Sequence, residues 1–219
     1  MPAYKPTPTC PVPPDLPPQA PAAAPAVLKI LITGGFGVGK TTMVGAVSEI
    51  PPLTTEEYLT AASAGTDRLT GVEDKSTTTV ALDFGRITFT RPQPLVLLLF
   101  GTPGQERFWF TWDDLSHGAV GAVVLVDTRR LADSFTVIGH FEQRGLPFVV
   151  AVNQFDGAHR YTAAEVRHAL ELPERVPVVE CDARDTRSAT TVLITLVSYA
   201  LSRTRLKAGA HRPAPLGAQ

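Results

Sequence analysis

Cysteine is scarce in this chain of 219 residues, in which Cys10 and Cys181 are the only two. Two cysteines so far apart give neither a disulfide framework nor a zinc-ligand spacing, and a reducing compartment such as the cytoplasm suits this composition. An excess of charge of one sign is also missing, because the formal net charge at pH 7 is −1. This balance gives no electrostatic reason to expect nucleic acid as the main partner.

A membrane-spanning run is missing as well, since no apolar stretch reaches the roughly 18 residues that a bilayer crossing needs. The start at Met1 and Pro2 shows neither a signal-peptide pattern nor the glycine required for myristoylation, and no prenylatable cysteine stands near Gln219. We therefore expect a cytoplasmic protein with no intrinsic membrane anchor, whose recruitment to any membrane would depend on a partner.

Large apolar side chains are nearly absent from residues 1–26, which hold 10 of the 20 prolines of the chain. Such a segment cannot bury a core, so we expect a disordered tail with polyproline II character. It could serve as an SH3-type ligand or a tether, or be a solvated extension. Residues 207–219 are expected to be a second disordered tail, which leaves residues 27–206 for one domain.

The most informative stretch runs from Val27 to Thr42. The apolar run Val27–Ile32 predicts a buried strand, and Gly34–Thr41 (GGFGVGKT) matches the phosphate-loop pattern G-x-x-x-x-G-K-[ST] without a mismatch. Glycines let such a loop turn its backbone N–H groups inward, and the following helix adds the positive end of its dipole. We expect nucleotide contacts from Gly35, Gly37, Val38, Gly39, Lys40, Thr41 and Thr42.

Strands and helices alternate along the rest of the chain. The pattern predicts a helix over Met43–Ile50 that ends at Pro51 and Pro52, and a long segment over Leu53–Thr78 with no strong strand, which could fold over the nucleotide. Further strands are predicted at Thr79–Phe89, Leu95–Phe100, Ala119–Val126, Pro147–Val152 and Val176–Glu180.

Two later helices carry local signals of their own. Thr162–Glu165 reads as a capping box, and in the last helix a core-facing stripe comprises Ala189, Val192, Leu193, Leu196, Val197, Ala200 and Leu201. Together the elements predict an α/β fold with a doubly wound, mostly parallel sheet and one antiparallel hairpin edge. The site should lie at the carboxyl ends of the strands.

Three more motifs follow predicted strands. They are Gly101–Phe108 (GTPGQERF), Asn153–Asp156 (NQFD) and Cys181–Ala183 (CDA). In this order, after the phosphate loop, they resemble the guanine-nucleotide motifs of the Ras superfamily of P-loop GTPases, from about residue 27 to 205. The long segment after the first helix and the Pro-Gly-Gln sequence are most similar to the bacterial gliding-motility type and the related actinomycete conservon GTPases.

For the base, the resemblance implies that Asp156 accepts two hydrogen bonds from guanine, which adenine cannot supply. Asn153 would brace the phosphate loop and contact the base, while the Ala183 N–H would meet guanine O6. Gln154 replaces the lysine of the family and would cover part of the base. Cys181 and Asp182 belong to the same base-binding loop.

For the phosphates and the metal, the resemblance implies Mg²⁺ bound by Thr41 and by Thr79, with Thr77 and Thr78 as competing candidates for the second position. Lys40 would reach the β- and γ-phosphates, and the Gly104 N–H the γ-phosphate. Gln105 would orient the attacking water, so that Gln105, Thr79 and Lys40 form the catalytic set.

The chain departs from the family in two ways. Gly101 stands where the family has an aspartate that holds a water on Mg²⁺, so either metal retention is weaker or another group substitutes. Thr78 stands where the gliding-motility relatives have an arginine, and an arginine finger is not assignable beyond Arg68 and Arg107 as weak candidates.

An apolar cluster follows Gln105 and comprises Phe108, Trp109, Phe110 and Trp112. It is either core packing or a surface for a partner that reads the nucleotide state. The function expected from the resemblance is a GTP-binding switch that hydrolyses GTP to GDP with Mg²⁺ and signals through partners, a roadblock-type regulatory protein among them. The alternatives are a non-hydrolysing guanine-nucleotide scaffold and an adenine-specific ATPase, which Asn153 and Asp156 disfavour.

Overall fold

The computed structural model describes residues 24–55, 82–91, 93–104 and 110–210. They form one sheet in the strand order β2-β3-β4-β1-β5-β6-β7. The strands are β1 (Ala26–Gly34), β2 (Leu53–Thr55), β3 (Leu82–Phe89), β4 (Leu95–Gly101), β5 (Ala119–Val126), β6 (Phe148–Asn153) and β7 (Val178–Cys181).

Five of these strands run parallel, from β4 through β1, β5 and β6 to β7, whereas β3 is antiparallel to both β4 and β2. The predicted fold class, a mostly parallel sheet with an antiparallel hairpin edge, is confirmed. The prediction of no strong strand over Leu53–Thr78 was wrong at its start, because Leu53–Thr55 pairs with β3 as β2. Residues 56–78 lie outside the described part of the chain.

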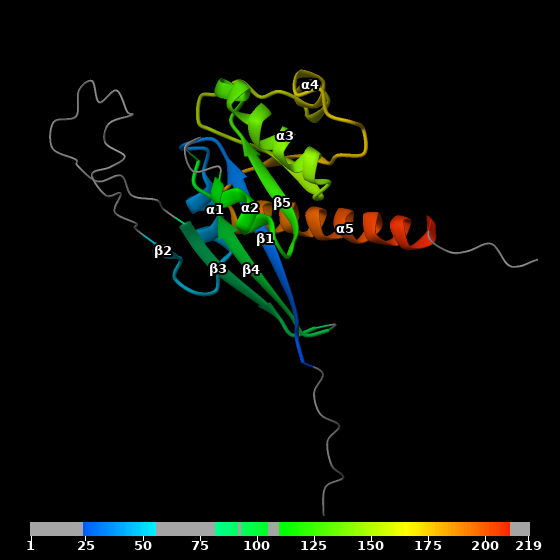
Figure 1. Cartoon of the computed structure of the whole chain (residues 1–219). Coiled ribbons are helices and arrows are strands. Elements are labelled where there is room, and N and C mark those ends of the chain that lie inside the picture. Colours follow the sequence, from blue (N-terminus) through cyan, green and yellow to red (C-terminus); the bar gives the residue numbers. More distant parts are fainter. Residues whose placement is uncertain (1–23, 56–81, 92, 105–109, 211–219) are drawn as a thin grey trace, which may run out of the picture.

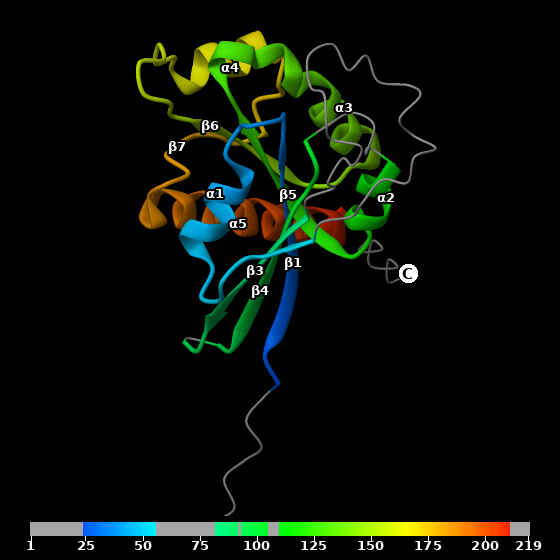
Figure 2. The same ribbon diagram turned by 90° about the vertical axis from the view of Figure 1, so that its left-hand side faces the viewer.

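Helices cover both faces of the sheet. They are α1 (Lys40–Val47), α2 (Phe110–Ser116), the 3-10 helix η3 (Thr128–Ser134), α3 (Phe135–Arg144), α4 (Ala163–Ala169) and α5 (Thr186–Ala210). Residues of α1 and α5 share one buried cluster with the sheet, and residues of α2, α3 and α4 share the other. Figures 1 and 2 show the long α5 crossing the sheet on the side of α1. Two apolar cores therefore hold the strand ends in place.

The first helix ends earlier than the prediction of Ile50. Ser48 already has an extended backbone (φ −71°, ψ 132°), and its hydroxyl donates to the Ile50 carbonyl at 2.7 Å. The Glu49 N–H then donates to the Arg86 carbonyl of β3 at 2.8 Å. Pairing with β3, rather than Pro51 and Pro52, thus ends α1.

The two local helix signals fare differently. The capping box is confirmed, since the Thr162 hydroxyl accepts from the Glu165 N–H while the Glu165 carboxylate accepts from the Thr162 N–H. In α5 the stripe members Ala189, Val192, Leu193, Leu196 and Ala200 are buried and Val197 is partly buried, but Leu201 is 54% exposed. Each residue turns about 100° around a helix, so Leu201 points past the core that Ala200 contacts.

Candidate functional site

The loop between β1 and α1 has the backbone of a phosphate cradle. Gly34 has φ +135°, and a Cβ there would lie 2.2 Å from the Leu125 carbonyl oxygen. Gly39 has φ +104°, and its Cβ would lie 2.7 Å from Nδ2 of Asn153. Only glycine combines this backbone conformation with such close neighbours. The loop therefore wraps tightly onto the first turn of α1, where unpaired backbone N–H groups favour an anion.

Lys40 lies along this loop. Its ammonium donates to the carbonyls of Gly34 and Gly35 at 2.9 and 2.7 Å. A Cβ at Gly104 would lie 2.6 Å from Nζ of Lys40, so the loop after β4 also reaches this cation. Burial lowers the pKa of Lys40 to about 8, while the charge of Asp83 acts in the opposite direction. A cation desolvated in this way is well placed to gain from a phosphate partner.

Asp83 is a site residue that the sequence motifs did not reveal. It lies on β3 with 3% exposure, and its Oδ2 accepts a hydrogen bond from the Thr41 hydroxyl at 2.6 Å. In the antiparallel ladder Asp83 stands opposite Gly101, where a Cβ would lie 2.9 Å from the Asp83 Cβ and 3.1 Å from Oδ2. The carboxyl of Asp83 therefore occupies the space that an aspartate at position 101 would need.

A carboxylate is therefore present beside Thr41, supplied by the strand next to the one that carries Gly101. The donor set also suits Mg²⁺, which prefers oxygen ligands and is commonly held by one or two protein oxygens together with substrate phosphates. Within the described residues no group of three His, Cys, Asp or Glu side chains forms an alternative metal site.

The segment after β4 is fixed from both sides. The Thr102 N–H donates to the Ile32 carbonyl at 2.9 Å, and its buried hydroxyl lies 3.0 Å from that of Thr33. The Trp112 indole N–H donates to the Pro103 carbonyl at 3.4 Å. These bonds place Gly104 over the phosphate loop.

Trp112 is 3% exposed, which favours core packing for this member of the aromatic cluster. Phe108 and Trp109 lie outside the described residues, as do Thr77, Thr78, Thr79, Gln105, Arg68 and Arg107.

Asn153 joins the base loops to the phosphate loop. It is 7% exposed at the end of β6, and its Nδ2 donates to the Val38 carbonyl at 2.9 Å. Its Oδ1 accepts from the Ala183 N–H at 3.0 Å. The expected brace between Asn153 and the phosphate loop is therefore present, but the Ala183 N–H expected to meet guanine O6 is used by Asn153.

Cys181 contributes to the base-binding loops through its backbone, since its carbonyl accepts a hydrogen bond from the Gln154 N–H at 2.8 Å. Burial raises the pKa of the Cys181 thiol to about 11. The thiol is thus neutral at physiological pH and serves as packing.

Asp156 lies at the mouth of the site with its side chain 88% exposed. Arg184 donates to both of its oxygens, at 3.0 and 3.3 Å, and also holds both oxygens of Asp182, at 3.0 Å each. The Arg184 hydrogen bond lowers the pKa of Asp156. The two oxygens expected to recognise guanine therefore already have a partner, and a base would have to displace Arg184.

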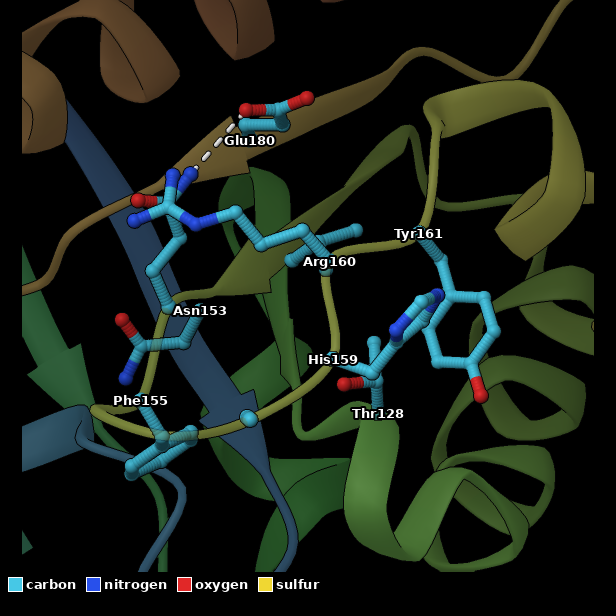
Figure 3. Close-up of a pocket in the computed structure, with 10 residues that line it drawn as sticks. Thr128, Asn153, Phe155, His159, Arg160, Tyr161 and Glu180 are labelled. Carbon is cyan, nitrogen blue, oxygen red and sulfur yellow. Dashed lines mark hydrogen bonds between the residues drawn. The ribbon is translucent and has the colours of Figure 1, made fainter.

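Figure 3 shows a small pocket whose lining includes Asn153, Gln154 and Phe155 of the NQFD motif. The rings of His159 and Tyr161 meet there edge to face, 4.5 Å apart, and Gln154 donates to Glu180 at 3.0 Å. Its volume of about 20 Å³ fits a single water but not a purine. The base is therefore expected beside Asp156 and not in this pocket.

Comparisons with known proteins bear on the family and the fold of this chain. A family model described as "Conserved hypothetical ATP binding protein" matches residues 32–203. Among solved structures, the G domain of the FeoB iron transporter of T. maritima shares the fold, with a TM-score of 0.55 and 18% identity over 80% of this chain and 99% of that chain.

Two further proteins resemble this chain in sequence. Ras-related protein Rab-7b of Bos taurus is 27% identical over 188 residues, which cover 81% of this chain and 84% of that protein. An uncharacterized protein of Methanocaldococcus jannaschii, MJ1339, is 28% identical over 131 residues, which cover 59% of this chain and 71% of its own length. These likenesses support a Ras-like P-loop domain.

Proposed function

The chain belongs to the family described as conserved hypothetical ATP binding proteins, and we propose that this member is a GTP-binding switch. It would hydrolyse GTP to GDP with Mg²⁺. The observation that carries the proposal is the buried Asp83 carboxylate, 2.6 Å from the Thr41 hydroxyl at the end of the phosphate loop. It supplies the acidic group that the motif at Gly101 lacks, beside the Lys40 cation.

The phosphates would be bound by groups that the structure places around one loop. Lys40 would exchange its bonds to the Gly34 and Gly35 carbonyls for the β- and γ-phosphates. Thr41 and Asp83 would hold Mg²⁺, with Thr79 as a further ligand; when bound, the ion neutralises charge on the phosphates. This set favours a triphosphate over other anions.

The attacking water would be positioned by the segment after β4. Gly104 lies against Lys40, and its N–H would donate to the γ-phosphate. Gln105, the next residue, would orient the water, so hydrolysis would rest on position rather than on a strong base. We expect the intrinsic reaction to be slow.

Guanine is the base that Asp156 supports. A carboxylate accepts the two N–H groups of guanine, whereas adenine offers no matching pair of donors. The family description names ATP instead, which makes base preference the first property to measure. Arg184 complicates the prediction, because it holds both oxygens of Asp156 until a base displaces it.

Partners would read the difference between the two nucleotide states. By the resemblance to the gliding-motility and conservon GTPases, we propose a roadblock-type regulatory protein as one such partner. Among the described residues no helix is both long and apolar enough to cross a membrane. We propose that the protein works in the cytoplasm and reaches a membrane only through a partner.

The rival of a non-hydrolysing scaffold rests on Gly101 and on the absence of an assignable cis arginine among the sequence motifs. The Asp83 carboxylate on the adjacent strand supports hydrolysis over this rival. The rival of an ATPase rests on the family description. The scaffold and the ATPase predict different results in the hydrolysis assay described next.

The test is single-turnover hydrolysis of GTP beside ATP, with Mg²⁺ and with EDTA, combined with calorimetric titration of both nucleotides. We expect GTP to bind at least about tenfold more tightly than ATP, a difference of about 1.4 kcal/mol, because guanine can donate two hydrogen bonds to the charged Asp156 and adenine cannot. Phosphate should be released from GTP only with Mg²⁺. GTP binding without phosphate release would support the scaffold, and preference for ATP would contradict the assignment of Asp156.

A further inference from the structure

Two adjacent arginines follow β5 and diverge from one buried acid. Asp127 is 4% exposed and accepts from Arg129 through Nε at 2.9 Å and Nη2 at 2.8 Å. The Arg129 guanidinium also lies 4.0 Å from the centre of the Phe155 ring, in the NQFD loop. Arg129 therefore supports the base side of the site.

Arg130 turns the other way, toward the phosphate loop. Its Nη2 donates to the Phe36 carbonyl at 2.7 Å and lies 3.8 Å from the point where a Cβ of Gly37 would stand. Phe36 and Gly37 are the third and fourth residues of the GGFGVGKT loop. A second cation, in addition to Lys40, thus touches the segment that would cradle the phosphates.

The local backbone explains why neighbouring side chains separate in this way. Within η3, Arg130 departs from helical geometry, with φ −142° and ψ 49°. A regular turn would set successive side chains about 100° apart around one axis. The kink instead directs Arg130 onto the loop, where Asp133 lies 4.0 Å from its Nη1 and Asp127 lies 3.9 Å from its Nη2.

The guanidinium keeps donors available while it is held there. An arginine offers five N–H donors, and the side chain of Arg130 is 48% exposed. The carboxylates of Asp127 and Asp133 lie 3.9 and 4.0 Å from the Arg130 guanidinium, near the upper limit for an ion pair. Neither therefore holds Arg130 as firmly as Asp127 holds Arg129 at 2.8 Å. The side chain can therefore exchange the Phe36 carbonyl for a phosphate oxygen by a small movement.

We propose that Arg130 is a catalytic arginine supplied by the chain itself, which contacts the phosphates of bound GTP. This inference rests on the proposed function. In the reaction a water oxygen forms a bond to the γ-phosphorus while the bond from that phosphorus to the β–γ bridging oxygen breaks. The electron pair stays on the β-phosphate, the water protons go to the released phosphate and solvent, and Arg130 offsets the charge that develops on the leaving oxygen.

The test compares Arg130→Ala and Arg130→Lys with the parent, and with Arg175→Ala as a matched control at an exposed arginine before β7. The measurements are single-turnover GTP hydrolysis, affinity for GDP, and affinity of the GDP-bound protein for aluminium fluoride. GTPases with an arginine in cis turn over at about 10⁻² s⁻¹, and those without one at a few 10⁻⁴ s⁻¹. We therefore expect Arg130→Ala to hydrolyse GTP about 30-fold more slowly than the parent. Aluminium fluoride binding should weaken similarly, while GDP affinity changes less than about threefold.

The outcomes separate the two proposals. If the parent binds no nucleotide, both are overturned. If the parent hydrolyses GTP and Arg130→Ala matches it in rate and in aluminium fluoride binding, this inference alone is overturned. An equal loss of GDP and aluminium fluoride affinity would also overturn it, because it would show that Arg130 only holds the loop in shape. Arg130→Lys keeps the charge but not the planar fork, so a rate near that of Arg130→Ala supports a directed contact.

Discussion

The position of Asp83 opposite Gly101 can be tested by exchanging these two residues between their neighbouring strands. Asp83→Asn removes the charge beside Thr41 but keeps the shape of the side chain. The double exchange of Asp83→Gly with Gly101→Asp returns a carboxylate to the same space from β4, since the two positions are partners in the ladder and their side-chain volumes overlap. We expect the single variant to lose its response to Mg²⁺ and the double exchange to regain it.

The size of the effect follows from the contact. Hydrogen bonds to a charged group contribute about 1.5–3 kcal/mol, and every 1.4 kcal/mol corresponds to about a tenfold change in an equilibrium constant. The factor by which Mg²⁺ tightens GTP binding should therefore fall about 10- to 150-fold in Asp83→Asn. In EDTA, where no metal bridges protein and phosphate, the parent and the variant should agree within about threefold.

The assay is calorimetric titration of GTP in Mg²⁺ and in EDTA, with thermal melts of each protein. The exposed Asp114 of α2 provides the control, and Asp114→Asn should behave as the parent. An unchanged Mg²⁺ response in Asp83→Asn would refute the role of this carboxylate. A folded double exchange that stays as weak as the single variant would show that the acid must come from β3.

Further predictions concern the cation, the base and the water. Lys40→Ala should abolish measurable GTP binding by calorimetry, since it deletes the cation of the phosphate loop. Because burial lowers the pKa of Lys40 to about 8, the GTP affinity of the parent should fall up to about tenfold from pH 8 to 9. Binding in this range should take up a proton, which makes the measured binding enthalpy differ between buffers. Asp156→Asn should shift preference from GTP toward XTP in competition titrations, and unchanged GTP affinity would remove Asp156 from the base site. Intrinsic turnover should lie in or below roughly 10⁻⁴ to 10⁻² s⁻¹ and rise at least about tenfold with the regulatory partner, a rise that Gln105→Leu should lose; a partner-free rate near 1 s⁻¹ would contradict this.

Strands and motifs at strand ends could be predicted because their signals are local. The run Val27–Ile32 followed by GGFGVGKT predicted β1, the cradle and the start of α1, all of which the structure contains. The same holds for the contact between Asn153 and the phosphate loop. These features depend on short stretches whose composition carries the geometry.

Asp83 could not be found in this way, because its role depends on pairing between two strands. In the alternating sequence Leu82–Phe84 it reads as one more polar residue on a half-exposed strand. The register that sets it opposite Gly101 is a long-range property. A usable signal was nevertheless present, since a strand that lacks an acid at its end had an acid in its hairpin partner.

The partners of Arg184 and Arg130 were missed for a related reason. Arg184 stands in a turn and Arg130 at the kink of η3, and at neither place does hydrophobic periodicity predict the direction of the side chain. Arg184 reaches Asp156 across 28 residues, and Arg130 reaches Phe36 across 94. The early end of α1 belongs to the same class, since Glu49 leaves the helix for a partner on β3.

Placing the acid on β3 has a mechanical consequence. β4 lies between β1 and β3 in the sheet, whereas on the outer side of β3 the described residues contribute the three-residue strand β2. Because side chains alternate along a strand, a slip of β3 by one residue against β4 would turn Asp83 to the opposite face, and a slip of two would carry it past Thr41. The proposed metal binding would therefore depend on the register of β3 against β4, a dependence that an acid on β4 itself would not have.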